Sequence, residues 1–487
     1  MPTTDGNKLT LTGLALIWGS LLIFMGFYYR TYDVSMDTIA MEFSRQSGVP
    51  IMVVEIGIVA FAVANGLGRA GYWQQLLPIT RALVVIFLST FWVSSVFVSV
   101  APSFSLLLNA GVVLQVLFAV AVYHCLPSVD YAGLSRVRII FVATLVVFSA
   151  MIFYKFAIAT PPHEMKIWQF AIPGFISIRL FGAVCGALLA FFLLMTLIDE
   201  EEDGAKSWHY IAITFVLGLT IWTGTRAAVL GVICALAMAI GFYRLQPRRV
   251  VIAKLCASLA LAVAIVWIIP PPDATLMIYT SGDYGSLNTA SAGRMEIWAA
   301  TWRAFLTVPI FGGGPGANSW MLPPDIFPHV QPHNVVLQFL INWGISGALP
   351  AFALLGIVTW RAHRIVLNNR SLLPVLAMLD CLLAMSMVDG ILHFARETMM
   401  VMMCFAIILR AGRVDQPAPH VQSRSRNHFV TIFFCPAVTG ILSCSALELG
   451  SPLRSMLFQA SSIALRGVTF RPAVGNSVSP PLWGSSR

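Results

Sequence analysis

Long apolar segments separated by short polar stretches recur along the chain from residue 9 to residue 409. A segment of roughly 20 apolar residues crosses a bilayer as an α-helix, and the seventh and twelfth segments here are short enough to be re-entrant. About twelve spans are expected, at residues 9–29, 51–66, 82–100, 104–126, 137–159, 178–198, 210–223, 226–243, 250–269, 333–358, 372–392 and 398–409. The pattern predicts an all-α, polytopic integral membrane protein. Its first segment ends without a small-residue cleavage site and is expected to be retained as a span.

The longest polar interruption covers residues 270–332 and includes a shorter helical pattern that begins near Ala292. Lys and Arg concentrate in alternate loops, which is how cytoplasmic loops are marked. These basic loops contain Arg69, Arg81, Arg136, Arg138, Lys206, Arg244, Arg248, Arg249, Lys254, Arg361, Arg364, Arg370, Arg410 and Arg413. The large loop 270–332, the turn 224–226 and the loop 160–177 are therefore expected on the periplasmic or outer side. Cytosolic nucleotides cannot reach that side, so chemistry there needs a substrate that arrives already activated.

Composition agrees with the membrane class and narrows the partners. Of 487 residues, 58% are hydrophobic and 10% are charged, and the mean hydropathy is +0.82. The formal net charge of +9 is distributed in the short basic loops, so no nucleic-acid partner is expected. The eight cysteines show no C-x-x-C spacing, and six of them lie in or beside apolar segments. Neither a metal site nor a disulfide framework is predicted.

The turn T-G-T-R-A-A at residues 223–228 is the first candidate for binding chemistry. Gly224 ends one span, Thr225 is a suitable N-cap, and Arg226 lies in the first turn of the next helix. A guanidinium beside free backbone N–H groups can bind a phosphate or diphosphate. An arginine whose side chain extends to the lipid headgroups is the alternative that this motif leaves open.

In the helical pattern near Ala292, one predicted apolar face carries Arg294 on its flank. That face consists of Met295, Trp298, Trp302, Phe305 and Leu306. The helix is expected to lie at the membrane surface, with Arg294 near a lipid-linked phosphate and Arg303 in solvent. The glycine-rich turn 311–318, F-G-G-G-P-G-A-N, has amides that could bind an anion, but taken alone it favours a structural loop over an anion site.

The segment Q-P-H-N predicts a helix whose first turn contains Pro332 and whose outer end carries His333. The helix dipole there favours a neutral imidazole, which can accept a proton near neutral pH. His329 precedes this helix and lacks the same restraint. A structural or solvated role for His333 remains the alternative when the histidine is considered alone.

Taken together and in order, the motifs T-G-T-R-A-A-V-L-G, G-R-M-E-I-W…P-I-F-G-G-G-P-G-A-N and P-H-N-V-V-L-Q-F-L-I-N-W-G-I-S-G resemble the bacterial O-antigen ligase and polysaccharide polymerase family over about residues 178–356. The resemblance implies a metal-independent, inverting glycosyltransferase without a cofactor. It places diphosphate-binding arginines at Arg226 and Arg294 and the essential histidine at His333. Arg179, at the outer start of the sixth span, is a further candidate for phosphate binding.

On this resemblance the donor is an undecaprenyl-diphosphate-linked glycan, and the reaction occurs at the periplasmic face of the bacterial inner membrane. The acceptor is lipid A-core for a ligase, or a second lipid-linked repeat unit for an O-antigen or exopolysaccharide polymerase. The ligase is preferred, from the P-H-N-V-V-L-Q segment. A transporter or flippase of lipid-linked sugars is the alternative of another class, but it requires charges near the bilayer midplane.

These patterns divide the chain into three parts. Residues 1–177 are expected to form N-terminal transmembrane helices, and residues 178–410 form the ligase- or polymerase-like catalytic domain with its loop 270–332. The tail 411–487 is rich in Ser, Pro and Arg, departs from the family pattern and is expected to be disordered. Its apolar patch at residues 429–447 is interrupted by Pro436 and Gly440, which argues against a further span.

Overall fold

A computed structural model describes residues 9–28, 36–69, 71–127, 129–154, 178–202, 207–245, 248–269, 294–322 and 331–413. The chain divides into two units, Met1–Ala437 and Val438–Arg487, and every described residue belongs to the first unit. The predicted tail 411–487, including the patch at 429–447, lies outside the described residues except for its first three positions.

The described part of the first unit is built from α-helices, and no strand occurs within it. Apolar runs without β-alternation favour helices, because a helix satisfies its own backbone hydrogen bonds in a membrane. The α-helices are α1 (Leu11–Tyr28), α2 (Met36–Ala64), α3 (Tyr72–Gln75), α4 (Pro78–Val93), α5 (Pro102–Cys125), α6 (Tyr131–Tyr154), α7 (Ile178–Glu202), α8 (Ser207–Trp222), α9 (Arg226–Tyr243), α10 (Arg249–Ile268), α12 (Arg294–Thr307), α13 (Asn318–Met321), α14 (Val335–Asn368), α15 (Leu373–Ser386) and α16 (Ala395–Ala411). Short helices of other types are η2 (Leu67–Arg69), η3 (Ser94–Val98), η7 (Arg370–Leu372) and η8 (Ile391–His393).

Each of the twelve predicted segments overlaps one of these α-helices. By length and composition, seven described helices could cross a membrane, and three shorter apolar helices accompany them. An all-helical membrane protein is thus confirmed. The total of about twelve spans stays a prediction, as does the periplasmic position of the loop 270–332.

Two predicted boundaries near the candidate site were wrong. The segment expected to end at residue 392 forms α15 only as far as Ser386, because the Asp389 carboxylate accepts the Gly390 N–H at 2.8 Å within a turn. The helix expected from residue 333 begins at Val335 and continues to Asn368. It kinks at Gly344, where φ is 61° and a side chain would collide with the Ile310 carbonyl.

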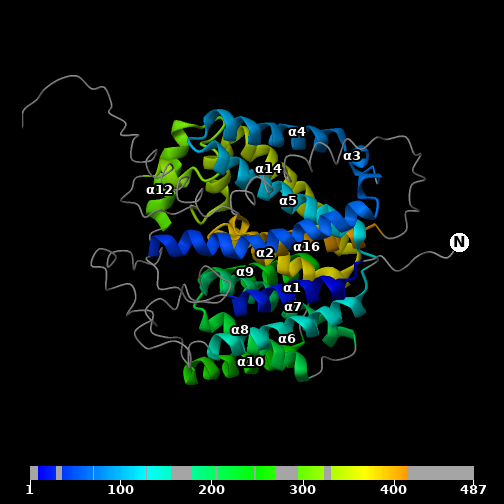
Figure 1. The fold of residues 1–487 in the computed structure, drawn as a ribbon. Helices are drawn as coiled ribbons and strands as arrows, with labels where there is room; N and C mark the ends of the chain where they lie inside the picture. The colour runs from blue at the N-terminus through cyan, green and yellow to red at the C-terminus, as the bar shows by residue number, and fades with distance from the viewer. Residues whose placement is uncertain are drawn as a thin grey trace, which may run out of the picture. The chain divides into compact units, whose positions relative to one another are not determined.

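Helix α7 is almost wholly buried and packs against α8, α9 and α15. Its contact with α9 is close, because Gly186 lies directly against Ala228 and leaves no room for a side chain at residue 186. Small residues at a helix interface let the two backbones approach in this way. Figure 1 shows α7, α8 and α9 side by side. Helix α12 lies at one end of α14, which it contacts.

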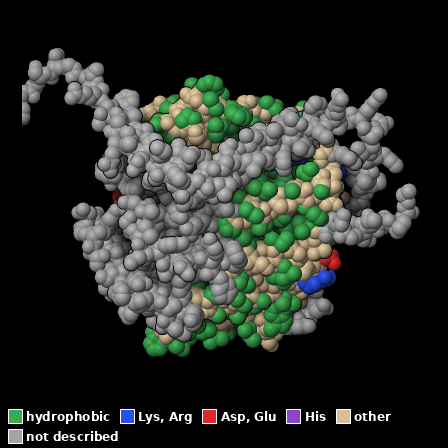
Figure 2. All heavy atoms as spheres, in the orientation of Figure 1, with side chains coloured by type: hydrophobic (Ala, Val, Ile, Leu, Met, Phe, Trp, Pro, Cys, Tyr) green, Lys and Arg blue, Asp and Glu red, His purple; other side chains and the backbone are tan. Residues whose placement is uncertain are grey.

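The outer helices present apolar side chains to their surroundings. Phe97, Trp267 and Leu349 are 80%, 84% and 64% exposed, respectively. On the face drawn in Figure 2, hydrophobic side chains cover most of the described surface, and the few visible charged groups lie near its edge. Such a surface fits a lipid environment rather than water.

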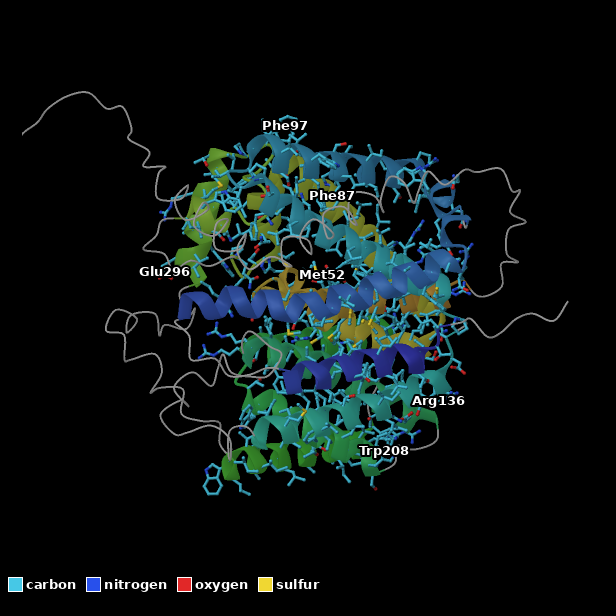
Figure 3. All side chains as sticks on the ribbon, viewed as in Figure 1. Met52, Phe87, Phe97, Arg136, Trp208 and Glu296 are labelled. Atoms are coloured by element: carbon cyan, nitrogen blue, oxygen red, sulfur yellow. The ribbon has the colours of Figure 1, made fainter. Side chains whose placement is uncertain are left out.

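Side chains predicted on opposite sides of the membrane lie at opposite ends of the helices. Figure 3 shows Glu296 of α12 at one end, and Arg136 of α6 with Trp208 of α8 at the other. The start of α12 and the basic loop at Arg136 thus lie at opposite ends, and which end faces the periplasm stays a prediction.

A topology assay can test that orientation. A reporter fused after Asp325 should be active in the periplasm, and one fused after Arg248 should be active in the cytoplasm, because Lys and Arg mark the cytoplasmic loops. Paired alkaline phosphatase and green fluorescent protein fusions measure the two compartments. Cytoplasmic activity of the Asp325 fusion would place the candidate site on the wrong side and overturn the orientation.

Candidate active site

The packing of α7 on α9 brings Arg179 and Arg226 to the same end of the two helices. Gly182 lies against the side chain of Thr225, with no space for a Cβ between them. Arg179 lies three residues before Gly182, and Arg226 directly follows Thr225. Because this contact fixes the relative height of the helices, both exposed arginines lie at the same end of the α7–α9 pair. Thr225 is the N-cap of α9, as expected, but its hydroxyl accepts no capping hydrogen bond.

Arg294, the first residue of α12, joins these two arginines. Burial lowers the pKa of Arg294, the nearby Asp389 carboxylate opposes that change, and the positive charges of Arg179 and Arg226 lower the pKa further. All three predicted arginines therefore lie within electrostatic reach of one another. Like charges held together in this way favour a site that an anion can occupy.

Helix α12 buries only part of the predicted apolar face against the protein. Its buried side chains are Ile297, Ala300, Thr301, Ala304 and Phe305. Of the predicted apolar face, Met295, Trp302 and Leu306 are exposed and Phe305 alone is fully buried. The small Ala304 and the Phe305 ring pack beside Ile341 of α14, and this contact leaves the bulkier side chains outside. Arg303 is exposed, as expected.

Helix α14 begins at Val335, so the prediction that Pro332 lies in its first turn was wrong, whereas His333 lies just outside the N-terminal end of the helix. Asn334 is the N-cap, because its side chain accepts the Leu337 N–H at 3.0 Å. His333 itself has a left-handed backbone with φ of 54°, a conformation that is uncommon outside glycine. Its side chain is 19% exposed and belongs to the same region as Arg294.

Asp389 connects the histidine to the arginines. Its Oδ1 lies 3.0 Å from His333 Nδ1, and its Oδ2 lies 3.7 Å from an Arg294 terminal nitrogen. Burial raises the pKa of Asp389, but the hydrogen bond and charge of His333, the Gly390 N–H and Arg294 outweigh it and hold the pKa below its ordinary value. In the neutral tautomer that carries its proton on Nδ1, His333 donates to the ionised Asp389 carboxylate and presents Nε2 as a proton acceptor.

The sequence analysis did not single out Asp389. It lies 56 residues after His333, within a segment assigned to a span, so no local motif links the two. The available signal was a carboxylate near the outer end of an apolar segment, because an ionisable residue in such a position is a functional candidate by default.

A second histidine, His393 of η8, lies close to the first. Burial and the nearby His333 lower the pKa of His393 to about 4. His393 is therefore neutral near pH 7 and adds no positive charge to the region. Two residues after His393, the Ala395 carbonyl at the start of α16 accepts a hydrogen bond from Gln115 in the middle of α5.

The glycine-rich turn 311–318 has a structural role at the kink of α14. The N–H groups of Gly313 and Gly314 donate to the Ile341 and Asn342 carbonyls at 2.7 and 3.0 Å. These amides are therefore occupied by the protein's own backbone. Of the two interpretations left open for this turn, the contacts favour the structural one over anion binding by these two amides.

Within the described ranges, no group of three or more His, Cys, Asp or Glu side chains could hold a metal ion. The residues gathered at the site are three arginines, one carboxylate and two histidines. This set suits binding of a phosphorylated anion next to a proton acceptor.

Comparisons with known proteins agree with the motif resemblance. Residues 211–352 match the family model for O-antigen ligase. This segment contains Arg226, Arg294 and His333, whereas Arg179 and Asp389 lie outside it. A comparison with curated proteins gave no match. The family is associated with glycosyltransferase-like ligase or polymerase activity on lipid-linked glycans. Residues 211–352 are thus similar to the O-antigen ligase family, and seven of the described helices are long and apolar enough to cross a membrane.

Proposed function

We propose that the protein transfers a glycan from undecaprenyl diphosphate to an acceptor hydroxyl at the periplasmic face of the inner membrane, as an O-antigen ligase with lipid A-core as the acceptor. The observation that carries the proposal is the convergence of Arg179, Arg226 and Arg294 beside the His333–Asp389 pair. Three guanidinium groups can neutralise a diphosphate, and a histidine at the same place can take a proton.

The reaction is a single displacement at the anomeric carbon of the donor. The acceptor oxygen forms the new bond to that carbon, and its proton moves to His333 Nε2. The bond between the anomeric carbon and the diphosphate oxygen breaks, and undecaprenyl diphosphate leaves with the bonding electron pair. Attack opposite to the leaving group inverts the anomeric configuration. Arg226 and Arg294 stabilise the negative charge that develops on the leaving group, with Arg179 as a further contact.

Asp389 supports this step without touching the substrate. Its carboxylate holds the Nδ1–H of His333 at 3.0 Å, which fixes the ring orientation and keeps Nε2 directed to the acceptor. The carboxylate also stabilises the imidazolium that forms when His333 takes the proton. Because the arginines supply the positive charge, the mechanism needs no divalent cation.

A polymerase is the second candidate, since the chemistry is the same with a second lipid-linked repeat unit as the acceptor. A transporter or flippase of lipid-linked sugars is less consistent with the structure. The site charges lie at one end of the helices, and Glu55 of α2 is a buried carboxylate within an apolar segment. Asp380 of α15 is a second carboxylate within an apolar segment, but it pairs with His363 at 3.2 Å, so these groups do not form the charged pathway that transport requires.

A deletion strain distinguishes these functions by its lipopolysaccharide on a gel. A ligase is expected to be required for every O-chain on core, so its loss leaves bare lipid A-core. Loss of a polymerase leaves a single repeat unit on core. An unaltered ladder in the deletion strain would contradict both O-antigen activities, and complementation with the wild-type chain is the control.

A further inference from the structure

The backbone at His333 needs support that its own conformation does not provide. His333 has φ of 54°, and a left-handed backbone is unfavourable for a residue with a Cβ. Pro332, directly before it, has no N–H that could anchor the chain. A proton acceptor has to be held within a fraction of an ångström of its working position. Other groups must therefore fix the segment 331–334.

Part of that support comes from the turn after α15. The Gln331 side chain occupies the space next to Gly390 where a Cβ would lie, and Asn334 Nδ2 donates to the Met387 carbonyl at 2.9 Å. Gln331 and Asn334 lie before and after His333 in the sequence, so the two contacts hold the segment on both sides of the histidine. They attach the segment to the α15 end of the site, but none of them connects it to α12, which carries Arg294.

The connection to α12 is made by Trp298. Its indole Nε1–H donates to the Pro332 carbonyl at 2.8 Å, and this carbonyl belongs to the peptide bond that leads into His333. Trp298 lies four residues after Arg294, which is about one helical turn. One turn of α12 therefore presents Arg294 to the diphosphate region and holds the backbone of the histidine.

We infer that Trp298 is a positioning residue, which sets the distance between the His333 imidazole and the Arg294 guanidinium by tying α12 to the Pro332 carbonyl. The inference rests on the proposed function. Trp298 touches neither substrate in this role and acts through His333. When its N–H is lost, the segment 331–334 keeps its contacts to the α15 turn, but His333 is no longer fixed relative to α12.

Trp298→Phe tests the inference, because phenylalanine retains an aromatic ring and removes the donor. Trp302→Phe is the matched control on the same helix, since Trp302 is exposed and shows no hydrogen bond within the described ranges. Full-length variants are purified in detergent, taken from the monodisperse peak and assayed with a lipid-diphosphate-linked glycan and lipid A-core. A second readout is the rate at which diethyl pyrocarbonate modifies His333, resolved by mass spectrometry.

For Trp298→Phe we expect kcat to fall about three- to tenfold, which is the usual effect of one hydrogen bond, with little change in KM for the donor. The His333 modification rate should rise, and Trp302→Phe should match the wild type in both measurements. In a His333→Ala background, Trp298→Phe should cause no further loss, because a residue that acts through His333 has nothing left to position.

Two results would overturn the inference. One is a Trp298→Phe protein with wild-type kcat and a wild-type His333 modification rate. The other is an equal loss of kcat with and without His333, which would mean that Trp298 acts elsewhere. If the wild-type protein transfers no glycan, the proposed function fails, and the modification rate alone then decides whether Trp298 positions His333.

Discussion

Replacing His333 with alanine should lower glycan transfer by about 10²–10⁴-fold, the usual contribution of a general base. The loss follows from the geometry, because Asp389 accepts the Nδ1 proton at 3.0 Å and leaves Nε2 as the acceptor for the attacking hydroxyl. Binding of the lipid-diphosphate donor should persist, since the arginines are unchanged. Transfer by purified protein in detergent measures the first effect, and retention of a radiolabelled donor measures the second.

His329→Ala is the control for this experiment. His329 lies outside the described residues and precedes Pro332 in the sequence, and its replacement should have little effect on transfer. The same assay with EDTA should give unchanged rates, because the arginines already meet the diphosphate charge. A fully active His333→Ala protein would remove the base from the mechanism. Inhibition by EDTA with rescue by magnesium would contradict a metal-independent reaction.

Arg294→Lys should reduce transfer about 100-fold, although the charge is conserved. Lysine lacks the planar fork that binds two phosphate oxygens at once, and hydrogen bonds to charged groups are among the strongest side-chain interactions. The Arg294 guanidinium also lies 3.7 Å from Asp389 Oδ2 and is partly buried, so the ammonium of a lysine side chain cannot occupy the same position. The rate of transfer at saturating acceptor and varied donor measures the change.

Arg303→Lys on the same helix is the matched control and should be almost silent, since Arg303 is exposed on another face of α12. Circular dichroism and size-exclusion profiles of both variants check that the fold is kept. Equal losses for Arg294→Lys and Arg303→Lys would show that the effect comes from the helix as a whole and not from a phosphate contact.

Much of the helical architecture follows from local information. Each predicted apolar segment overlaps an α-helix, because segment length and the need to satisfy backbone groups in lipid are both visible in the sequence. The grouping of Arg179, Arg226 and Arg294 was also predictable, since loop orientation alone places all three on one side. Their catalytic roles remain proposals.

Features that depend on contacts between distant segments were not predictable. Asp389 contacts His333 although 56 residues separate them in the sequence, and no local motif near either residue indicates that they pair. On α12, the helical period indicated a large apolar face. In the structure Ala304 and Phe305 pack beside Ile341 of α14, whereas Trp302 is exposed. The glycines of residues 312–314 are compatible with anion binding until the Ile341 and Asn342 carbonyls are known to occupy two of the amides.

The close contact between α7 and α9 also bears on how the site can move. With Gly186 against Ala228 and Gly182 against Thr225, the two helices interlock at two heights and cannot slide past each other without a steric clash. Arg179 and Arg226 thus belong to one rigid body, and the spacing of their guanidinium stems is set before the donor arrives. The third arginine, Arg294, belongs to α12, so its distance from this fixed pair depends on where α12 is held.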